Sequence, residues 1–305
     1  MSLLSIKDLN VRFRIRDDTF HAVKDFCLDM ESGDRIALVG ESGSGKSVVA
    51  SAVFGILERN ATYDGSVIFD GKELGSLSRA EFDVLRRKEM VLIPQNVSQA
   101  WDPLLRIGKQ MTEFITASGI PKTDAEKKAE EYLSRCGFDE PKRIMGTYPH
   151  RLSGGMSQRA MIAMCMSVEP KLVVADEPTK GLDESVRGNV LDLLTSDEWD
   201  SSLLMITHDL HSASRCGKVM VMYGGRCIES GTVSEILEHP MHPYTKGLMD
   251  SEPSKGLKAI PFASRDIVDG ECSFANRCAY ADKGCSNDCF RYGDREVRCH
   301  RAGSL

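Results

Sequence analysis

Short apolar runs separated by polar turns recur along this chain, and their length predicts buried strands. Residues 36–39 form one such run, which passes through a glycine-rich segment into a periodic apolar segment after Ser47. That order predicts strand, loop and helix. Residues 172–175 form a second run that ends in adjacent carboxylates, and SSLLMITHDL contains a third that ends near His208. Because buried parallel strands place the residues that follow them at one edge of a sheet, the pattern predicts an α/β core with polar residues at that edge.

Other regions predict additions to this core. The region before residue 95 is expected to form an antiparallel sheet around it, in which GSVIFDGKEL is a strand and a turn. The region from about residue 97 to residue 167 shows little strand signal, which predicts a helical insert. There, Thr123 and Glu126 are expected to form a capping box before a helix that Gly137 closes.

The last part of the chain differs in composition from the rest. Five of the ten cysteines lie in the final 34 residues, and a segment rich in Gly, Ser, Pro and Lys precedes them. We therefore expect a main domain over residues 1–250, a linker over 251–270 and a small cysteine-rich module over 271–305.

Composition narrows the function classes. The chain has 305 residues, of which 41% are hydrophobic and 28% charged, which is typical of a folded protein with one large core and a smaller unit. No apolar run approaches the roughly 20 residues of a membrane helix, and the start has no basic flank before an apolar stretch, so a cytosolic, reducing environment is expected. A net charge of −6 without a basic, aromatic-containing block argues against a nucleic-acid partner.

The glycine-rich segment carries the clearest chemistry. Gly40, Gly45, Lys46 and Ser47 satisfy the spacing G-x-x-x-x-G-K-[ST], in which backbone N–H groups and a helix N-terminus surround phosphates. Lys46 is expected to reach the β and γ phosphates, and Ser47 to bind Mg²⁺. A plain structural turn is the alternative, but the strand-to-helix context favours a nucleoside triphosphate site. Its candidate residues are Gly40, Glu41, Ser42, Gly43, Ser44, Gly45, Lys46 and Ser47.

Polar residues after two of the predicted strands add to this site. Asp176 is suited to bind Mg²⁺, and Glu177 to orient and deprotonate a water molecule. His208 could hydrogen-bond a γ phosphate. An acidic pair alone is more often a solvated helix start, and a lone histidine is often bonded locally. Both assignments therefore depend on the phosphate loop.

The order of these motifs resembles that of ATP-binding cassette (ABC) ATPases. LSGG at residues 152–155 is similar to their signature motif, Gln95 to their Q-loop glutamine and Asp183 to their D-loop aspartate. The resemblance implies an α/β P-loop NTPase fold, with a RecA-like core, an antiparallel β-subdomain and a helical insert. It also implies ATP hydrolysis, with Glu177, His208 and Gln95 as catalytic residues.

The same resemblance implies contacts with ATP and Mg²⁺. The signature and the D-loop are expected to contact ATP bound to a second ATPase subunit, although Met156 stands where a glutamine is usual. Phe13 matches the aromatic position that stacks on adenine, with Phe20 as the competitor. The implied ATP contacts outside the phosphate loop are Phe13, Ser153, Gly154, Gly155 and Asp183, and the implied Mg²⁺ ligands are Ser47, Gln95 and Asp176.

Residues near the C-terminus resemble one branch of this family. HPYT at residues 242–245 and a tail of the form C-x-F-x-x-R-C are similar to the ATPases of oligopeptide, dipeptide and nickel importers. This implies import of an oligopeptide or dipeptide, or else of nickel or another metal chelate. It also implies a heterodimer with a paralogous ATPase, two transmembrane permeases and an extracytoplasmic substrate-binding protein, with this chain at the cytoplasmic face of the cell membrane. The alternatives are a soluble ABC ATPase, such as one in iron–sulfur assembly, and a regulatory module that no longer hydrolyses ATP.

The clustered cysteines favour metal binding, because disulfides are rare in a reducing compartment. By the same resemblance, Cys272, Cys278, Cys285 and Cys299 are expected to hold a [4Fe–4S] cluster, with Cys289 as a substitute for Cys299. Structural zinc is the second possibility, since it prefers closer cysteine pairs, and unliganded thiols are the third. A module of about 35 residues buries little core, which favours some ligand.

Overall fold

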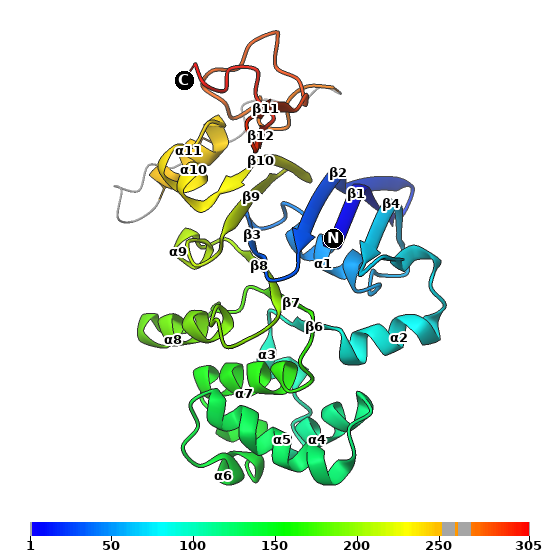
Figure 1. Ribbon diagram of the computed structural model, residues 1–305. Coiled ribbons are helices and arrows are strands. Elements are labelled where there is room, and N and C mark those ends of the chain that lie inside the picture. The colour runs from blue at the N-terminus through cyan, green and yellow to red at the C-terminus, as the bar shows by residue number, and fades with distance from the viewer. Residues whose placement is uncertain (1, 252–259, 262–269, 305) are drawn as a thin grey trace. The chain divides into compact units, whose positions relative to one another are not determined.

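The computed structural model describes residues 2–251, 260–261 and 270–304, and the chain forms two compact units (Figure 1). The first unit comprises Glu31–Arg35 and Leu74–Ile206, and the second comprises Ser2–Met30, Ile36–Glu73 and Thr207–Leu305. Most of the predicted linker, residues 252–259 and 262–269, lies outside the described residues. Within the described ranges, no helix is both long and apolar enough to cross a membrane.

Three neighbouring parallel strands form the core of the first unit. They are β6 (Met90–Ile93), β7 (Leu172–Asp176) and β8 (Ser202–Thr207), with β7 between the other two. Strand β8 is buried over its whole length, and β7 is buried up to Asp176. The sequence predicts β7 and β8 correctly, because continuous apolar runs are typical of strands covered on both faces.

Helices make up most of the rest of the first unit. All the elements between residues 97 and 167 are helical, as the sequence predicts. The helices of the unit are α2 (Arg79–Lys88), α3 (Val97–Ala100), α4 (Ile107–Ala117), α5 (Lys122–Arg135), α6 (Pro141–Met145), α7 (Gly154–Met166) and α8 (Glu184–Leu194), with short 3-10 turns at Leu74–Ser76 and Pro149–Arg151.

The predicted capping box at Thr123 is wrong. Helix α5 begins earlier, with Pro121 at its N-cap, and the carbonyl oxygen of Pro121 accepts the first helical hydrogen bonds. Thr123 therefore lies inside the first turn, where its hydroxyl cannot act as a cap. The predicted end is correct, because Gly137 has a left-handed φ of 79° just after the last turn.

The second unit contains an antiparallel sheet in the order β2–β1–β4–β5, which agrees with the sequence prediction. Its strands are β1 (Ser2–Ile15), β2 (Asp18–Glu31), β4 (Ala61–Phe69) and β5 (Lys72–Glu73). The register between β1 and β4 shifts between Lys7 and Asn10. At that bulge, a Cβ on Gly65 would lie 2.4 Å from the carbonyl oxygen of Asp8, so the close approach of the two strands requires glycine.

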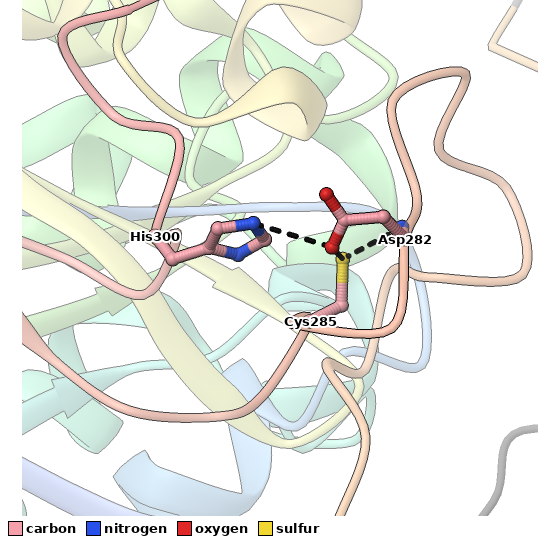
Figure 2. A group of neighbouring side chains, drawn as sticks. All are labelled: Asp282, Cys285 and His300. Carbon is pink, nitrogen blue, oxygen red and sulfur yellow. Dashed lines mark hydrogen bonds and ion pairs between the residues drawn. The ribbon is translucent and has the colours of Figure 1, made fainter.

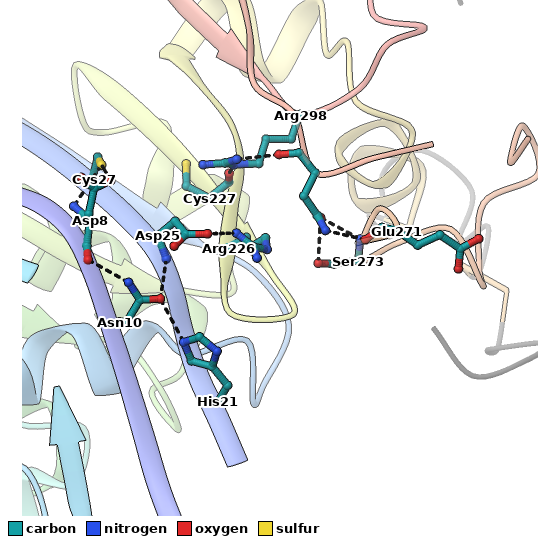
Figure 3. Close-up of polar contacts among 11 residues, drawn as sticks. Asp8, Asn10, His21, Asp25, Cys27, Arg226, Cys227, Glu271, Ser273 and Arg298 are labelled. Atoms are coloured by element: carbon teal, nitrogen blue, oxygen red, sulfur yellow. Dashed lines mark hydrogen bonds and ion pairs between the residues drawn. The ribbon is translucent and has the colours of Figure 1, made fainter. Parts of the chain in front are cut away.

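Asn10 links this bulge to β2 (Figure 3). Its amide nitrogen donates to the carbonyl oxygen of Asp8 at 2.9 Å, and its Oδ1 accepts from the N–H of Asp25 at 3.2 Å. The same oxygen lies 3.0 Å from Nε2 of His21. A buried amide needs such partners, so these bonds hold the two neighbouring strands in one register.

A second run of strands in this unit follows the order β3–β9–β10–β12–β11. Strand β3 (Arg35–Val39) is parallel to β9 (Lys218–Tyr223), whereas β10 (Arg226–Thr232) is antiparallel to β9 and to β12 (Arg295–Val297), which pairs with β11 (Phe290–Tyr292). The helices are α1 (Lys46–Val53), α9 (Leu210–Ala213), α10 (Val233–Glu238) and α11 (Pro243–Asp250). The cysteine-containing tail thus continues the sheet beyond β10.

Two arginines fasten the tail to β10. The fully buried carboxylate of Glu229 accepts a hydrogen bond from Arg295 at 2.7 Å and from two backbone N–H groups at 2.7 and 3.0 Å. Arg298 donates from Nε to the carbonyl oxygen of Cys227 at 2.9 Å (Figure 3). These contacts between protein groups anchor the tail to the sheet. They weaken the argument that so short a segment needs a ligand in order to fold.

Candidate functional site

The glycine-rich segment forms a loop between β3 and α1 whose geometry suits a phosphate. Lys46 is buried at the start of α1, and its ammonium donates to the carbonyl oxygens of Gly40 at 2.8 Å and Glu41 at 2.9 Å. Ser47 follows in the first turn and is exposed. The loop therefore combines a buried lysine ammonium, an exposed serine and the start of a helix.

Two glycines allow the loop to lie directly against neighbouring backbone. A Cβ on Gly40 would lie 2.1 Å from the carbonyl oxygen of Met222 on β9. A Cβ on Gly45, which has a φ of 104°, would lie 2.6 Å from the carbonyl oxygen of Ala22 on β2. Since a side chain at either position would displace backbone, the motif's glycines are required by close packing as well as by the turn.

Asp176 and Glu177 stand at the end of β7 in the first unit, and both are half-buried. Glu177 has a left-handed φ of 48°, and its N–H donates to the carbonyl oxygen of Ile206 on β8 at 2.8 Å. Such a backbone conformation is uncommon outside glycine and is often found at functional sites. The neighbouring strand thus fixes the backbone from which the Glu177 carboxylate projects.

The signature residues open helix α7 in the same unit. Ser153 is the N-cap, and its hydroxyl accepts from the N–H of Met156 at 3.2 Å. Gly154 is exposed, whereas Gly155 is buried against α8, where an added Cβ would lie 2.3 Å from Cγ1 of Val186. The two glycines therefore differ: one leaves the helix start open, and the other permits close helix packing.

The other predicted residues lie at the ends of elements or on strands. Asp183 is at the N-cap of α8, and Gln95 is exposed after β6, both in the first unit. His208 is exposed after β8, Phe13 is half-buried on β1 and Phe20 is 56% exposed on β2, all in the second unit. The phosphate loop also belongs to the second unit. Phe13 and Phe20 both stay candidates for stacking on adenine.

The tail thiols fall into two groups. Burial, with smaller contributions from the nearby thiols of Cys285, Cys299 and Cys278, raises the pKa of Cys272 to about 11. All four of these cysteines are half-buried. Cys289 is exposed and instead lies close enough to Cys227, which is half-buried, to contribute to the raised pKa of the Cys227 thiol. The four predicted ligands thus share one neighbourhood.

Cys285 also has two polar neighbours (Figure 2). Its sulfur, a carboxylate oxygen of Asp282 and a ring nitrogen of His300 lie within 4.8 Å of one another. Asp282 forms an ion pair with Arg301, whose hydrogen bond lowers the pKa of Asp282 to about 2. Since Asp282 is already paired with a cation, the sulfur atoms are the better metal donors in this neighbourhood.

Sequence reasoning missed a contact between the tail and the phosphate loop. Both terminal nitrogens of Arg277 donate to the carboxylate of Glu41, at 2.9 and 3.2 Å. The hydroxyl of Tyr244 accepts from the backbone N–H of Glu41 at 3.1 Å. Arg277 is the arginine of C-x-F-x-x-R-C, and Tyr244 is the tyrosine of HPYT. The two motifs therefore singled out Arg277 and Tyr244, but nothing near them in the sequence indicates that they contact Glu41.

Comparison with known proteins agrees with this geometry. Residues 23–180 match a family model described as ABC transporter, and residues 228–285 match one described as oligopeptide/dipeptide transporter, C-terminal region. The chain is 40% identical to the oligopeptide transport ATP-binding protein OppD of Haemophilus influenzae, over 93% of this chain and 91% of the relative. It is 38% identical to the dipeptide transport ATP-binding protein DppD of Lactococcus lactis subsp. cremoris, over 87% of this chain and 79% of the relative.

A solved structure shares the fold. It is a dimeric ATP-binding cassette in a post-hydrolysis state, bound to ADP and phosphate, with a TM-score of 0.68 and 23% sequence identity. The similarity covers 75% of this chain and 98% of that one. Together with the phosphate loop, the signature at the start of α7 and the acidic pair after β7, these matches confirm the resemblance that the sequence motifs indicate. The chain belongs to the ABC transporter family, as an ATP-binding subunit that carries the oligopeptide/dipeptide transporter C-terminal region.

Proposed function

We propose that this chain is the ATP-hydrolysing subunit of an importer for oligopeptides or dipeptides. The observation that carries the proposal is the match of residues 228–285 to the oligopeptide/dipeptide transporter C-terminal region, next to an ABC ATPase domain. Both relatives described above are named as peptide transport proteins, which favours a peptide over nickel or another metal chelate. A soluble ATPase of iron–sulfur assembly would leave this C-terminal region without a role.

The phosphate loop would supply most of the binding chemistry. Lys46, which the loop's own carbonyl oxygens hold in place, would donate to the β and γ phosphates of ATP. Ser47, Asp176 and Gln95 offer hydroxyl, carboxylate and amide oxygens, which are the donors that Mg²⁺ prefers. When bound, Mg²⁺ would neutralise part of the triphosphate charge. Phe13, with Phe20 as the competitor, would stack on adenine.

Hydrolysis needs a base and groups that stabilise the γ phosphate. Glu177 would orient the attacking water and accept its proton, and His208 would hydrogen-bond the γ phosphate. The signature residues Ser153 and Gly154, together with Asp183, would serve ATP bound to the second ATPase of a head-to-tail dimer. ATP binding would close that dimer, and hydrolysis would reopen it.

The proposed assembly follows from the same family assignment. The second ATPase would be a paralogue, and the helical insert of about residues 97–167 would dock on one of two transmembrane permeases. An extracytoplasmic binding protein would deliver the peptide. This chain would therefore work at the cytoplasmic face of the cell membrane, held there by the permeases. The main domain would span residues 1–250, and the tail would span residues 271–305.

For the tail we propose a [4Fe–4S] cluster held by Cys272, Cys278, Cys285 and Cys299, with zinc as the alternative metal. Two observations support it: the four thiols are half-buried, and they lie within electrostatic reach of one another. Burial raises the pKa of Cys278 and of Cys299, and Arg301 offsets part of that rise. Its charge favours the thiolate form that metal binding requires.

The ATPase proposal is tested by changing the base. In the reconstituted transporter, Glu177→Gln should leave ATP binding intact and slow hydrolysis at least ~10²-fold, the scale of losing a general base. Glu184→Gln is the matched control, because Glu184 is an exposed glutamate in the first turn of α8, and it should leave the hydrolysis rate unchanged. Lys46→Ala should weaken the binding of fluorescent ATP. Normal turnover in Glu177→Gln would contradict the assignment.

A further inference from the structure

Two residues from the C-terminal part of the chain hold Glu41, the second residue of the phosphate loop. Arg277 makes a two-point hydrogen bond to its carboxylate, at 2.9 and 3.2 Å, and the Tyr244 hydroxyl accepts its backbone N–H at 3.1 Å. All three residues belong to the second unit. The side chain and the backbone of one loop residue are therefore both fixed from outside the loop.

Arg277 is itself held in one place. It donates from Nη1 to the hydroxyl of Tyr223 at 3.3 Å and from Nε to the carbonyl oxygen of Pro261 at 2.7 Å. Its guanidinium lies over the rings of Tyr223 and Phe274, 5.6 and 5.9 Å from their centroids, and its side chain is 16% exposed. A planar guanidinium with these neighbours is a fixed charge rather than a mobile surface cation.

Tyr244 is equally well supported. Its side chain is fully buried, and its ring packs 4.6 Å from that of Tyr223 and 5.4 Å from that of Phe274, measured between centroids. Phe274 belongs to the cysteine tail and Tyr244 to HPYT, so the two C-terminal motifs share one aromatic cluster. This cluster is the platform from which both residues reach the loop.

The charge of Glu41 matters because of where the residue lies. Its carbonyl oxygen accepts a hydrogen bond from the Lys46 ammonium at 2.9 Å, so Glu41 adjoins the cation assigned to the phosphates. A bound triphosphate would bring several negative charges to the same neighbourhood, and like charges repel strongly at short range. Pairing with Arg277 neutralises the carboxylate and keeps it directed toward the tail.

We propose that Arg277 is a positioning residue for ATP binding, which acts by neutralising and holding Glu41 while Tyr244 fixes the loop backbone. The C-terminal region thereby sets the affinity for ATP. This inference rests on the proposed role of the phosphate loop and adds a role for the two C-terminal motifs.

The test measures the Kd for fluorescent ATP and the hydrolysis rate of the reconstituted transporter. Arg277→Ala should raise the Kd about five- to tenfold and leave kcat at saturating ATP within about twofold, since Arg277 contacts no reacting atom. Adding Glu41→Gln to Arg277→Ala should restore the Kd to within about twofold of the wild type, because the unpaired carboxylate is then removed. A purely structural role of Arg277 would not be rescued in this way.

Arg291→Ala is the matched control. Arg291 also pairs with a tail carboxylate, that of Glu296 at 2.6 Å, but its side chain is 79% exposed and this pair joins β11 to β12 within the tail. Its substitution should leave the Kd for ATP unchanged. An unchanged Kd in Arg277→Ala, or no rescue by Glu41→Gln, would overturn the proposal.

Two further variants keep the outcome interpretable. If Arg277→Ala does not fold, Arg277→Lys replaces it, since lysine keeps the charge but loses the two-point geometry, and an intermediate Kd is expected. Tyr244→Phe keeps the ring packing and should raise the Kd by about twofold through loss of one hydrogen bond. Lys46→Ala tests the loop independently of the tail, so a failure of the proposed function is distinguished from a failure of this inference.

Discussion

The two glycines of the signature motif offer a matched pair of substitutions with opposite expected results. A Cβ on Gly155 would lie 2.3 Å from Cγ1 of Val186, so the Val186 side chain or one of the helices α7 and α8 must shift. A Cβ on Gly154 would lie 3.5 Å from the Leu182 side chain, which is an ordinary contact. Both positions are in the first turn of α7, so both variants share any helix-propensity gain, which is at most about 1 kcal/mol. Overpacking costs about 1–3 kcal/mol, and we expect Gly155→Ala to be less stable than Gly154→Ala by that amount.

Urea denaturation followed by far-ultraviolet circular dichroism measures this difference directly. The ATPase rate of the assembled transporter supplies the second measurement. Gly154→Ala should keep the stability of the wild type but lower ATP hydrolysis, because the exposed helix start is assigned to the nucleotide. Unfolding free energies of the two variants within about 0.5 kcal/mol of each other would refute the packing argument.

Two other predictions concern the C-terminal region. Burial lowers the pKa of His242 from 6.5 to about 3, so the unfolded chain takes up a proton below pH 6.5 that the folded chain does not. Stability is therefore full above pH 6.5 and should fall by about 2 kcal/mol by pH 5. In His242→Asn, the side-chain oxygen can accept the backbone N–H of Tyr244 that His242 accepts. This variant should have the same free energy of unfolding at pH 7 and pH 5. An equal loss of stability at pH 5 in the variant and the wild type would contradict the assignment to His242. Protein purified without oxygen should contain about four irons and four sulfides per chain, lost in Cys278→Ser and kept in Cys289→Ser. Zinc in their place would support the alternative metal, and no metal would end the cluster proposal.

The parts of the fold that the sequence predicts well depend on local patterns. The runs at residues 172–175 and around SSLLMITHDL are continuous and apolar, and buried parallel strands require that pattern. The phosphate loop is similarly readable, because the glycines and Lys46 lie within eight residues of one another. The predicted cap at Thr123 is wrong because the helix begins two residues earlier, with Pro121 at its N-cap.

What the sequence could not predict depends on contacts between distant residues. Arg277 and Glu41 are 236 positions apart, and neither the tail motif nor the phosphate loop indicates by its own sequence that the two residues pair. The pairing of β12 with β10 involves a strand of three residues, too short for any periodicity to show. Gly155 matches a signature motif in sequence, but only the position of Val186 shows that it also serves packing.

The most direct test of the account measures ATP-driven uptake of a labelled oligopeptide into vesicles that contain this chain with its permeases and partner ATPase. The account predicts uptake that requires both ATP and the binding protein and that is lost when Glu177→Gln replaces the wild-type chain. Peptide uptake at the wild-type rate with Glu177→Gln would contradict the account. So would a wild-type complex that hydrolyses ATP and takes up a metal chelate but no peptide.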